Sequence, residues 1–304
     1  MIKPGLHLIT MDKYLADPCQ HPSLSSSCAH KLLARSPLHA WYEHPKLGRK
    51  GGDNEDDDNL ASDTGTIAHD MLLGGEGTIC VIDPEDHRSA PTKINPDGSV
   101  PKGWTNASIR QARDDARTLG LTPILKDKYA DVSNMVHAAK TFLATTELAG
   151  VLDRGRPEMT MIWEEEGTWF RARPDWLTDN GDVMLHYKTT LASARPEPFI
   201  RGLMPSMGYD VALSFYRRGH EALGGSPDTQ HLIFVQEQAA PYACSLIGLS
   251  PVMMAIADEK VNRAVKLWRE CMRTKTWPAY SPEIHYADPT AWQLAEAEAA
   301  LQNF

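Results

Sequence analysis

Apolar and polar residues alternate through the middle of the chain in the manner of paired β-strands. Three short apolar stretches separated by polar turns predict a strand meander over residues 159–163, 168–173 and 183–188. Two later stretches of the same kind predict strands at residues 231–237 and 243–249. Apolar residues recur at helical spacing within residues 65–73, 206–223 and 251–273. This order of helices and strands predicts a mixed α/β sheet flanked by helices.

The first half of the chain has a mainly helical composition. The serine cluster and the Ser36-Pro37 break predict a capped helix and a second helical start within residues 23–42. Residues 107–148 are helical in composition with a break near 120–123, whereas residues 84–106 are typical of a long loop or insertion. We therefore expect one domain over residues 1–304, with a helical part to about residue 150 and a core over about 151–280.

Composition is that of a protein with a sizeable core. The chain has 304 residues, of which 42% are hydrophobic, and it contains no apolar run long enough to span a membrane. Its N-terminus lacks the pattern of a signal peptide, so we expect a cytoplasmic protein without membrane contact. The five cysteines are scattered without a C-x-x-C pair, which argues against a disulfide framework and a zinc knuckle and favours buried free thiols.

The net charge of -9 argues against a general electrostatic attraction to nucleic acid. A local one remains open, because Lys31, Arg35, Lys46, Arg49 and Lys50 form a basic segment that could line a channel. The alternative interpretation is that these side chains only keep the surface soluble. The acidic run over residues 51–63 is expected to form a surface loop, and it lacks the glycine and glutamate placement of a calcium-binding loop.

Candidate chemistry lies in the strand meander. Pro174-Asp175 is followed by His186-Tyr187-Lys188, and a hairpin would bring these side chains to one point because alternate residues of a strand share a face. In metal-dependent nucleases, carboxylates at such positions hold a divalent metal and the lysine positions or activates the attacking water. Here the second acid position holds His186. His69, inside the helix predicted over residues 65–73, would by itself more often be a partly buried side chain than a ligand.

Several short motifs occur in a characteristic order along nearly the whole chain. They are Leu24-Ser25-Ser26-Ser27, Ser36-Pro37, Gly65-Thr66-Ile67-Ala68-His69, Arg173-Pro174-Asp175, Lys188-Thr189-Thr190, Tyr209-Asp210 with Phe215-Tyr216, and Thr276-Trp277-Pro278-Ala279. This succession resembles the catalytic region of exonuclease VIII, the RecE-type branch of the PD-(D/E)XK (restriction-endonuclease-like) nucleases. The resemblance implies a mixed sheet flanked by helices and a metal-dependent exodeoxyribonuclease.

The resemblance also implies substrate, partners and site residues. Members of that family digest linear double-stranded DNA from the 5′ end as ring-shaped homo-oligomers and leave a 3′ single strand for recombination. We therefore expect Mg²⁺ or Mn²⁺ as cofactor, a single-strand annealing protein as partner, and a phage or prophage protein in the bacterial cytoplasm. The implied metal ligands are His69 and Asp175, the implied catalytic lysine is Lys188, and Tyr216 belongs to the same site. Candidate DNA contacts are Lys31, Arg35, Arg173, Thr189 and Thr190.

Two positions depart from the family pattern. His186 stands where the family has aspartate, and Ala212 stands where it has glutamine. Magnesium prefers hard oxygen ligands, so its affinity should fall, whereas manganese accepts imidazole and could still be held by His69, Asp175 and His186. Asp182 lies four residues from His186 on the expected strand, roughly 13 Å away, which is too far for a substitute acid.

Three interpretations remain open from the sequence. The first is an exonuclease whose activity His186 and Ala212 weaken. The second is a catalytically degenerate relative that binds DNA ends or another protein. The third is an unrelated α/β protein with accidental motifs. Residues 289–301 add an alanine- and glutamate-rich amphipathic pattern that predicts a helix suited to an oligomer contact.

Overall fold

Five strands form the central sheet of the protein. The computed structural model describes residues 2–48, 60–74, 79–87, 95, 103–104 and 106–302, with side chains of residues 60–63 and 302 excepted. The sheet has the order β11-β10-β9-β8-β5. Its strands are β5 (Gly155–Pro157), β8 (Trp176–Thr178), β9 (Val183–Thr190), β10 (Gln230–Glu237) and β11 (Cys244–Gly248). Among the pairings of this sheet, β9 with β10 is parallel, with His186 opposite Ile233, and the others are antiparallel. The sheet is therefore mixed, as predicted.

A second sheet of four strands adjoins the central sheet through the chain segment between β7 and β8. Its order is β1-β6-β7-β2, and its strands are β1 (Gly5–His7), β2 (Ser23–Leu24), β6 (Thr160–Glu165) and β7 (Thr168–Ala172). Residues 173–175 connect β7 of this sheet to β8 of the central sheet. The Arg-Pro-Asp motif therefore lies at the junction of the two sheets, because proline at its centre cannot donate to a strand ladder.

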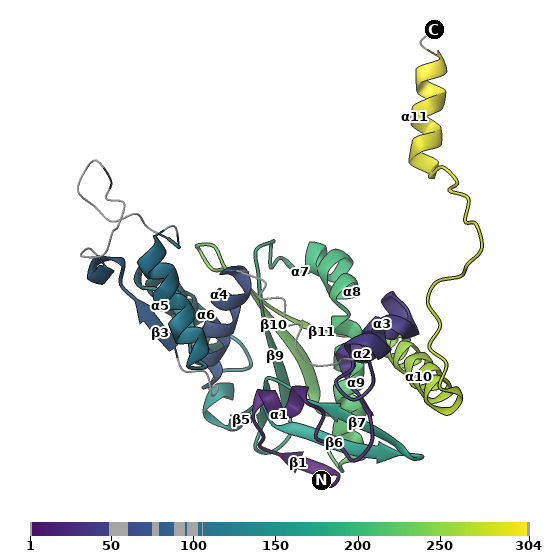
Figure 1. Ribbon diagram of the computed structural model, residues 1–304, viewed down its shortest axis with the longest axis horizontal. Helices are drawn as coiled ribbons and strands as arrows, with labels where there is room; N and C mark the ends of the chain where they lie inside the picture. Colours follow the sequence, from purple (N-terminus) through teal and green to yellow (C-terminus); the bar gives the residue numbers. More distant parts are fainter. Residues whose placement is uncertain are drawn as a thin grey trace.

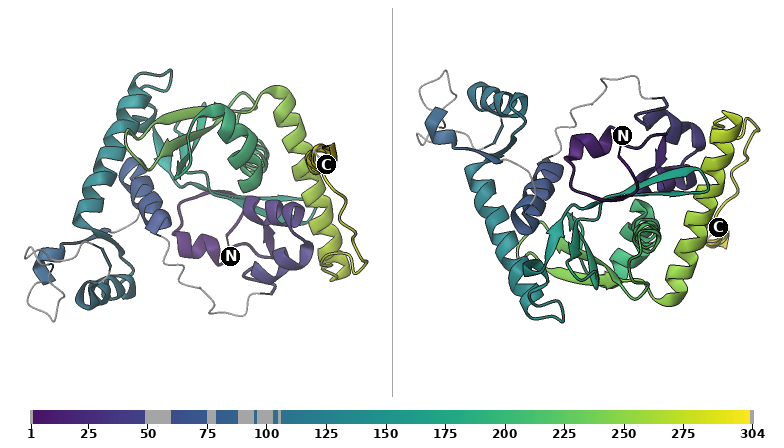
Figure 2. Two further views of the ribbon diagram at one scale, coloured as in Figure 1. Left: turned by 90° about the horizontal axis from the view of Figure 1, so that it is seen from above. Right: turned by 90° about the horizontal axis from the view of Figure 1, so that it is seen from below.

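Helices cover both faces of the central sheet. On one face, α4 (Leu60–Leu73) and α6 (Lys126–Ala144) pack Ile67, Ala68 and Met135 against strand residues such as Leu185 and Phe234. On the other face lie α2 (Ser26–Ala34), α3 (Pro37–Glu43), α9 (Tyr209–Ala222) and α10 (Pro251–Thr274). Figure 2 shows the long helices α6 and α10 on opposite sides of the body, with the sheets between them.

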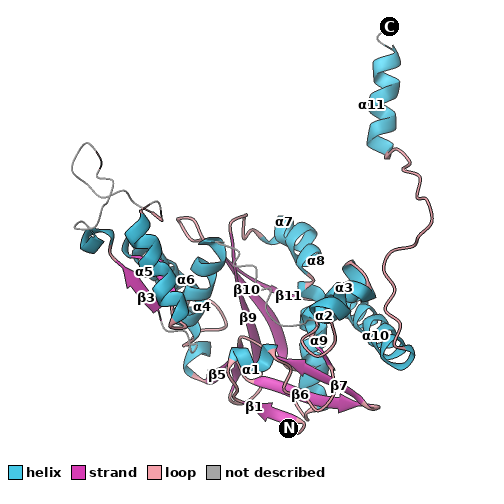
Figure 3. Ribbon diagram, viewed as in Figure 1, coloured by secondary structure: helices cyan, strands magenta, loops and turns pink. Residues whose placement is uncertain are grey.

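The break predicted near residues 120–123 is a strand. Helix α5 (Ala107–Thr118) ends, and β4 (Thr122–Leu125) then pairs in parallel with β3 (Ile79–Ile82) before α6 starts. Ile82, Ile109 and Leu125 form a small core of their own, and Figure 3 shows β3 and α5 beside α6, apart from the central sheet. The structure therefore has a strand at the predicted break, but neither β3 nor β4 was predicted, because a four-residue strand carries too short a pattern to be recognised.

Other predicted segments are confirmed with shifted ends. The helix expected over residues 206–223 corresponds to α9 and the end of α8 (Met204–Met207), with left-handed Gly208 between them. A π-helical segment (Phe199–Leu203) directly precedes α8. Two short helices, α1 (Met11–Leu15) and α7 (Pro196–Pro198), and two 3₁₀ turns (Pro84–His87 and Val151–Asp153) complete the body. Arg49, Lys50, nearly all of the acidic run and most of the loop expected over residues 84–106 lie outside the described residues.

The C-terminal segment leaves the body. After α10, an extended stretch leads to α11 (Ala291–Gln302), which projects away from the rest of the molecule in Figure 1. Its large apolar side chains are exposed, with Trp292 at 70% and Leu301 at 77%. All five cysteines are free thiols, and Cys19 and Cys271 are buried. Within the described part of the chain, no helix is both long and apolar enough to cross a bilayer.

Candidate functional site

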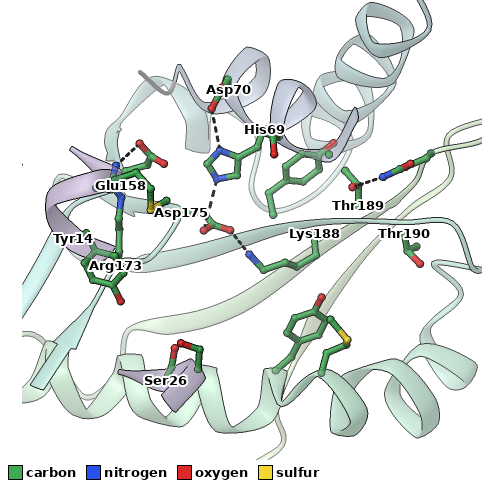
Figure 4. A pocket seen from close by; sticks show the side chains of 18 of the residues that line it. Tyr14, Ser26, His69, Asp70, Glu158, Arg173, Asp175, Lys188, Thr189 and Thr190 are labelled. Atoms are coloured by element: carbon green, nitrogen blue, oxygen red, sulfur yellow. Dashed lines mark hydrogen bonds and ion pairs between the residues drawn. The ribbon is translucent and has the colours of Figure 1, made fainter. Parts of the chain in front are cut away.

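A large open cleft lies where the two sheets meet. Its volume is about 1200 Å³. Side chains from α1, α2, α4, β9 and α9 line it, together with Glu158, Arg173 and Asp175 near the sheet junction. The motifs that are widely separated in the sequence therefore reach one place, and Figure 4 shows their side chains converging there.

Three of the predicted site residues are in direct contact in this cleft. Lys188 Nζ donates a hydrogen bond to Asp175 Oδ2 at 2.8 Å. The other carboxylate oxygen, Oδ1, lies 3.7 Å from His69 Nε2, and His69 Nδ1 lies 3.7 Å from Asp70 Oδ1. In Figure 4 the Asp175 carboxylate sits between the imidazole and the ammonium group. The structure thus brings His69, Asp175 and Lys188 together from α4, the sheet junction and β9.

His69, Asp175 and Lys188 shift one another's pKa values. Burial alone would raise the pKa of Asp175, but the positive charges of Lys188 and His69 hold that pKa far below its usual range. Burial lowers the pKa of His69, yet the neighbouring carboxylates of Asp175 and Asp70 outweigh it and raise the pKa to about 9. Burial likewise opposes the charge of Lys188, and Asp175 raises its pKa. At neutral pH the site therefore holds an ionised carboxylate between two cations.

Local sequence explains why the helix and the strand approach so closely. Gly65, at the start of the motif that carries His69, lies against Thr189 of β9, and a Cβ on this glycine would lie only 2.7 Å from the threonine Oγ1. Any larger residue would push α4 away from the sheet. Because His69 follows Gly65 by one turn of helix, the close approach brings its imidazole over Asp175.

A second ion pair supports the Arg-Pro-Asp motif. Arg173 is 7% exposed and donates to Glu158 Oε2 at 2.7 Å and to the carbonyl oxygen of Ile9 at 2.5 Å. The Glu158 amide in turn donates to the Asp175 carbonyl at 3.1 Å, and Glu158 has a left-handed backbone with φ of 53°. This strained residue is held in place by partners on both sides, so the pair fixes the position of the Asp175 backbone.

The two departures from the family pattern lie next to each other. The ring of His186 stacks on that of Tyr216 with centroids 4.5 Å apart and planes at 16°. His186 is 3% exposed, and Ala212 lies beside the pair in a second, smaller cavity that also has Lys188 on its wall. Burial lowers the pKa of His186 to about 3 and raises that of Tyr216 to about 12. Both rings are therefore uncharged at neutral pH.

The candidate DNA contacts fall into two groups. Arg173, Thr189 and Thr190 line the cleft. Lys31 and Arg35 belong to α2 and its C-terminal cap and are not among the cleft-lining residues, and Lys31 forms an ion pair with Glu43. The basic N-terminal segment, as far as the structure describes it, is thus displaced from the cleft itself.

The donor set fits a divalent ion only in part. His69 and Asp175 supply one imidazole nitrogen and one carboxylate within reach of each other. Within the described residues, however, no three histidine, cysteine or acidic side chains are close enough to hold a metal together. Glu158 is occupied by Arg173. An imidazole nitrogen beside a single carboxylate suits manganese better than magnesium, which prefers oxygen ligands.

Polar side chains from distant segments form hydrogen bonds in and beside the cleft. Ser25 caps α2 through the Cys28 amide, as expected of the serine cluster, whereas Ser26 donates to the Tyr216 hydroxyl at 3.4 Å. Gln238 donates to Thr189 at 2.9 Å. Such partners come from distant segments, and the sequence gives no signal for them beyond the polarity of the side chains.

The fold agrees with what comparison with known proteins shows. Residues 106–290 match the family described as a PDDEXK-like domain of unknown function (DUF3799). The chain belongs to this family. The match covers β5 to β11, the junction carrying Asp175 and the strand carrying Lys188. PDDEXK nucleases generally depend on divalent metal ions.

The chain is also similar to solved structures, of which the first below shares its fold. A protein from Eubacterium rectale, provisionally named an exonuclease, is similar over 95% of this chain and 98% of its own, with 10% identity and a TM-score of 0.50. A phage-related exonuclease from Haemophilus somnus is similar over 84% of this chain and 97% of its own, with 11% identity and a TM-score of 0.32. No curated protein matches the chain significantly. The mixed PDDEXK-like architecture predicted from the sequence is thus confirmed.

Proposed function

We propose that this chain is a RecE-class 5′–3′ exonuclease of linear double-stranded DNA, with hydrolysis weakened by His186 and Ala212. The contact between Asp175 and Lys188 in an open cleft, with His69 on the other carboxylate oxygen, carries this proposal. In a PDDEXK-like fold these are the groups that meet the scissile phosphate. The products would be duplexes with 3′ single-stranded ends for recombination.

Each residue has a distinct part in this proposal. Lys188 is charged and would hold a water or a phosphate oxygen at its ammonium group, while Asp175 stays ionised across the neutral range. The Arg173–Glu158 pair positions Asp175 through its backbone. A divalent ion held by His69 and Asp175 would supply positive charge to the reacting phosphate. Binding there requires His69 to lose its proton, which favours activity at alkaline pH.

The partners follow from the same proposal. A linear duplex would enter the cleft, and further copies of the chain would form a ring in which α11 contacts a neighbour through its exposed Trp292 and Leu301. A single-strand annealing protein would take up the product strand. We propose a single domain over residues 1–304 acting in the bacterial cytoplasm as a phage or prophage protein.

A second candidate function is binding of DNA ends without cleavage. The residue at the second acid position favours this second function, because His186 is buried, uncharged and stacked on Tyr216. Asp175 is then the single carboxylate in contact with Lys188 among the described residues. A site of this kind retains the cleft and the lysine but has lost one negative ligand position for the metal.

Digestion of a 5′-phosphorylated linear duplex distinguishes the two functions. The unchanged chain, Lys188→Ala, and a double variant carrying His186→Asp and Ala212→Gln would be compared in Mg²⁺ and in Mn²⁺. We expect slow digestion by the unchanged chain in Mn²⁺, loss of it in Lys188→Ala, and faster digestion by the double variant in Mg²⁺. If the unchanged chain binds ends but digests none in either metal, and the double variant digests, end binding is the function.

A further inference from the structure

A second, smaller cavity adjoins the cleft at Lys188 and extends to His186 and Ala212, which do not line the cleft. It has a volume of about 170 Å³ and is lined by residues of α2, β9, β10 and α9. A single water needs only about 15 Å³ of cavity. The space is therefore sufficient for an ion of several heavy atoms together with water.

The polar lining of this cavity consists of donors. Its polar side chains are two hydroxyl-bearing serines, two imidazoles, one ammonium and two phenols, and none of the lining residues is acidic. They are Ser26, Ser27, His30, His186, Lys188, Tyr209 and Tyr216. Asp175 lines the larger cleft but not this cavity. Such a lining offers several groups that can donate hydrogen bonds to the oxygens of an anion, one of them a charged ammonium.

One nitrogen of this lining has no hydrogen-bond partner. The side chain of His186 is only 3% exposed, and its Nε2 atom is buried without a hydrogen bond. A buried nitrogen left unpaired costs about 1–3 kcal/mol, so an unpaired group of this kind calls for an explanation. A ligand in the adjoining cavity would supply the missing partner.

Both departures from the family pattern contribute to this cavity. Ala212 and His186 both line it. Glutamine at position 212 would fill space that alanine leaves open, and aspartate at position 186 would place a carboxylate on the wall. The two changes act together, because one makes room and the other removes a negative charge.

We propose that this cavity binds a small tetrahedral oxyanion of the phosphate type. Its oxygens would accept hydrogen bonds from His186 and Lys188, with the hydroxyl groups of Ser26 and Tyr216 as further donors. Binding of the anion depends on the lining of the cavity, and it does not require cleavage of DNA. Free phosphate and the phosphate monoester at a polynucleotide end share this chemistry, and the test below separates them.

Titration with inorganic phosphate tests the site itself. Calorimetry on the full chain in EDTA, together with histidine ring signals in NMR spectra, should show saturable binding. His186→Asp and Ala212→Gln should each weaken it at least about tenfold, a change of about 1.4 kcal/mol. His220→Gln is the matched control, because His220 is a buried imidazole that does not line the cavity, and it should leave phosphate affinity unchanged.

Duplexes with a 5′-phosphate or a 5′-hydroxyl end identify the source of the anion. If the phosphorylated end binds more tightly in EDTA, and free phosphate competes, the ligand is the polynucleotide end. Equal affinity of both ends with saturable phosphate binding assigns the site to the free ion. The proposal is overturned if phosphate does not saturate, or if both folded variants bind it as the unchanged chain does. DNA-end binding without phosphate binding would overturn the anion site and leave the proposed function intact.

Discussion

The imidazole of His186 lies face to face with the phenol of Tyr216, at 4.5 Å between ring centroids. One ring comes from β9 and the other from α9, so the stack joins the central sheet to the helix that covers it. His186 is buried and Tyr216 is partly buried. Stacked aromatic pairs contribute about 0.5–1.5 kcal/mol beyond the area they bury. The residue that replaces the second acid therefore stabilises the helix–sheet contact.

Two substitutions of Tyr216 should distinguish the contribution of the stacked ring to stability from that of the hydroxyl group. Tyr216→Phe keeps the ring and loses only a long hydrogen bond with Ser26, so we expect a loss of about 1 kcal/mol or less in the free energy of unfolding. Tyr216→Ala leaves a cavity beside His186 and should cost about 3–5 kcal/mol. Urea unfolding monitored by circular dichroism measures both. Similar losses in the two variants would show that the hydroxyl, not the stack, matters for stability.

The Asp175–Lys188 pair should show a measurable coupling energy. Lys188 is a third exposed and Asp175 is 15% exposed, so solvent screens the interaction in part, and we expect roughly 1–3 kcal/mol. A double-mutant cycle with Asp175→Asn and Lys188→Met measures it. The same cycle on Arg195 and Glu197, an ion pair with both side chains more than 60% exposed, is the control and should give less than about 0.5 kcal/mol. Equal couplings for the two pairs would contradict a special role of the cleft pair.

Sequence patterns predicted the long strands and missed the short ones. Apolar residues dominate Val183–Tyr187 of β9 and fill Leu232–Val235 of β10, which is enough for recognition. By contrast, β2 has two residues and β5 three, and each forms only because a partner from another segment lies beside it. Strands of that length carry no periodicity of their own.

The candidate site was predictable to a similar extent. Asp175 and Lys188 are brought together by a local hairpin, so their spacing in the sequence was sufficient to predict the contact. His69 could be placed there only through the family resemblance, because its approach depends on how α4 packs against β9. The burial of His186, and its stack with Tyr216, depend on the packing of α9. The sequence alone could not distinguish a histidine facing the cleft from one enclosed beside it.

Gly219→Ala should destabilise the protein although it lies within a helix. A Cβ at this position would lie 2.6 Å from the ring of Trp163, which is 1% exposed and cannot move aside. Overpacking of this kind costs about 1–3 kcal/mol, which exceeds the gain of about 1 kcal/mol for alanine over glycine in a helix. Thermal unfolding is the measurement. Gly202→Ala is the control, because its Cβ would meet nothing within 4 Å, and it should be neutral or stabilising.

His231 should make the protein less stable as the pH falls below neutrality. It is 5% exposed, both ring nitrogens lack partners, and burial lowers its pKa from 6.5 to about 3, with His186, His220 and Arg217 adding repulsion. Between these two pKa values the unfolded chain binds more protons than the folded one, so the free energy of unfolding decreases as the pH falls from 6.5 towards 3. At pH 5 the loss is roughly 2 kcal/mol relative to pH 7. Above pH 7 the residue contributes no further change.

Replacement of that imidazole isolates its share of the pH dependence. His231→Leu removes the proton-binding group and two unpaired nitrogens, so its stability relative to the unchanged chain should increase by roughly 2 kcal/mol between pH 7 and pH 5. Urea unfolding at several pH values provides the comparison. Ile233→Val, a buried and non-titrating change two residues along the same strand, should lower stability by a similar amount at every pH. A parallel shift for both variants would mean that His231 does not titrate on unfolding, and the acid sensitivity would then have to come from the other buried imidazoles of the α9 interface.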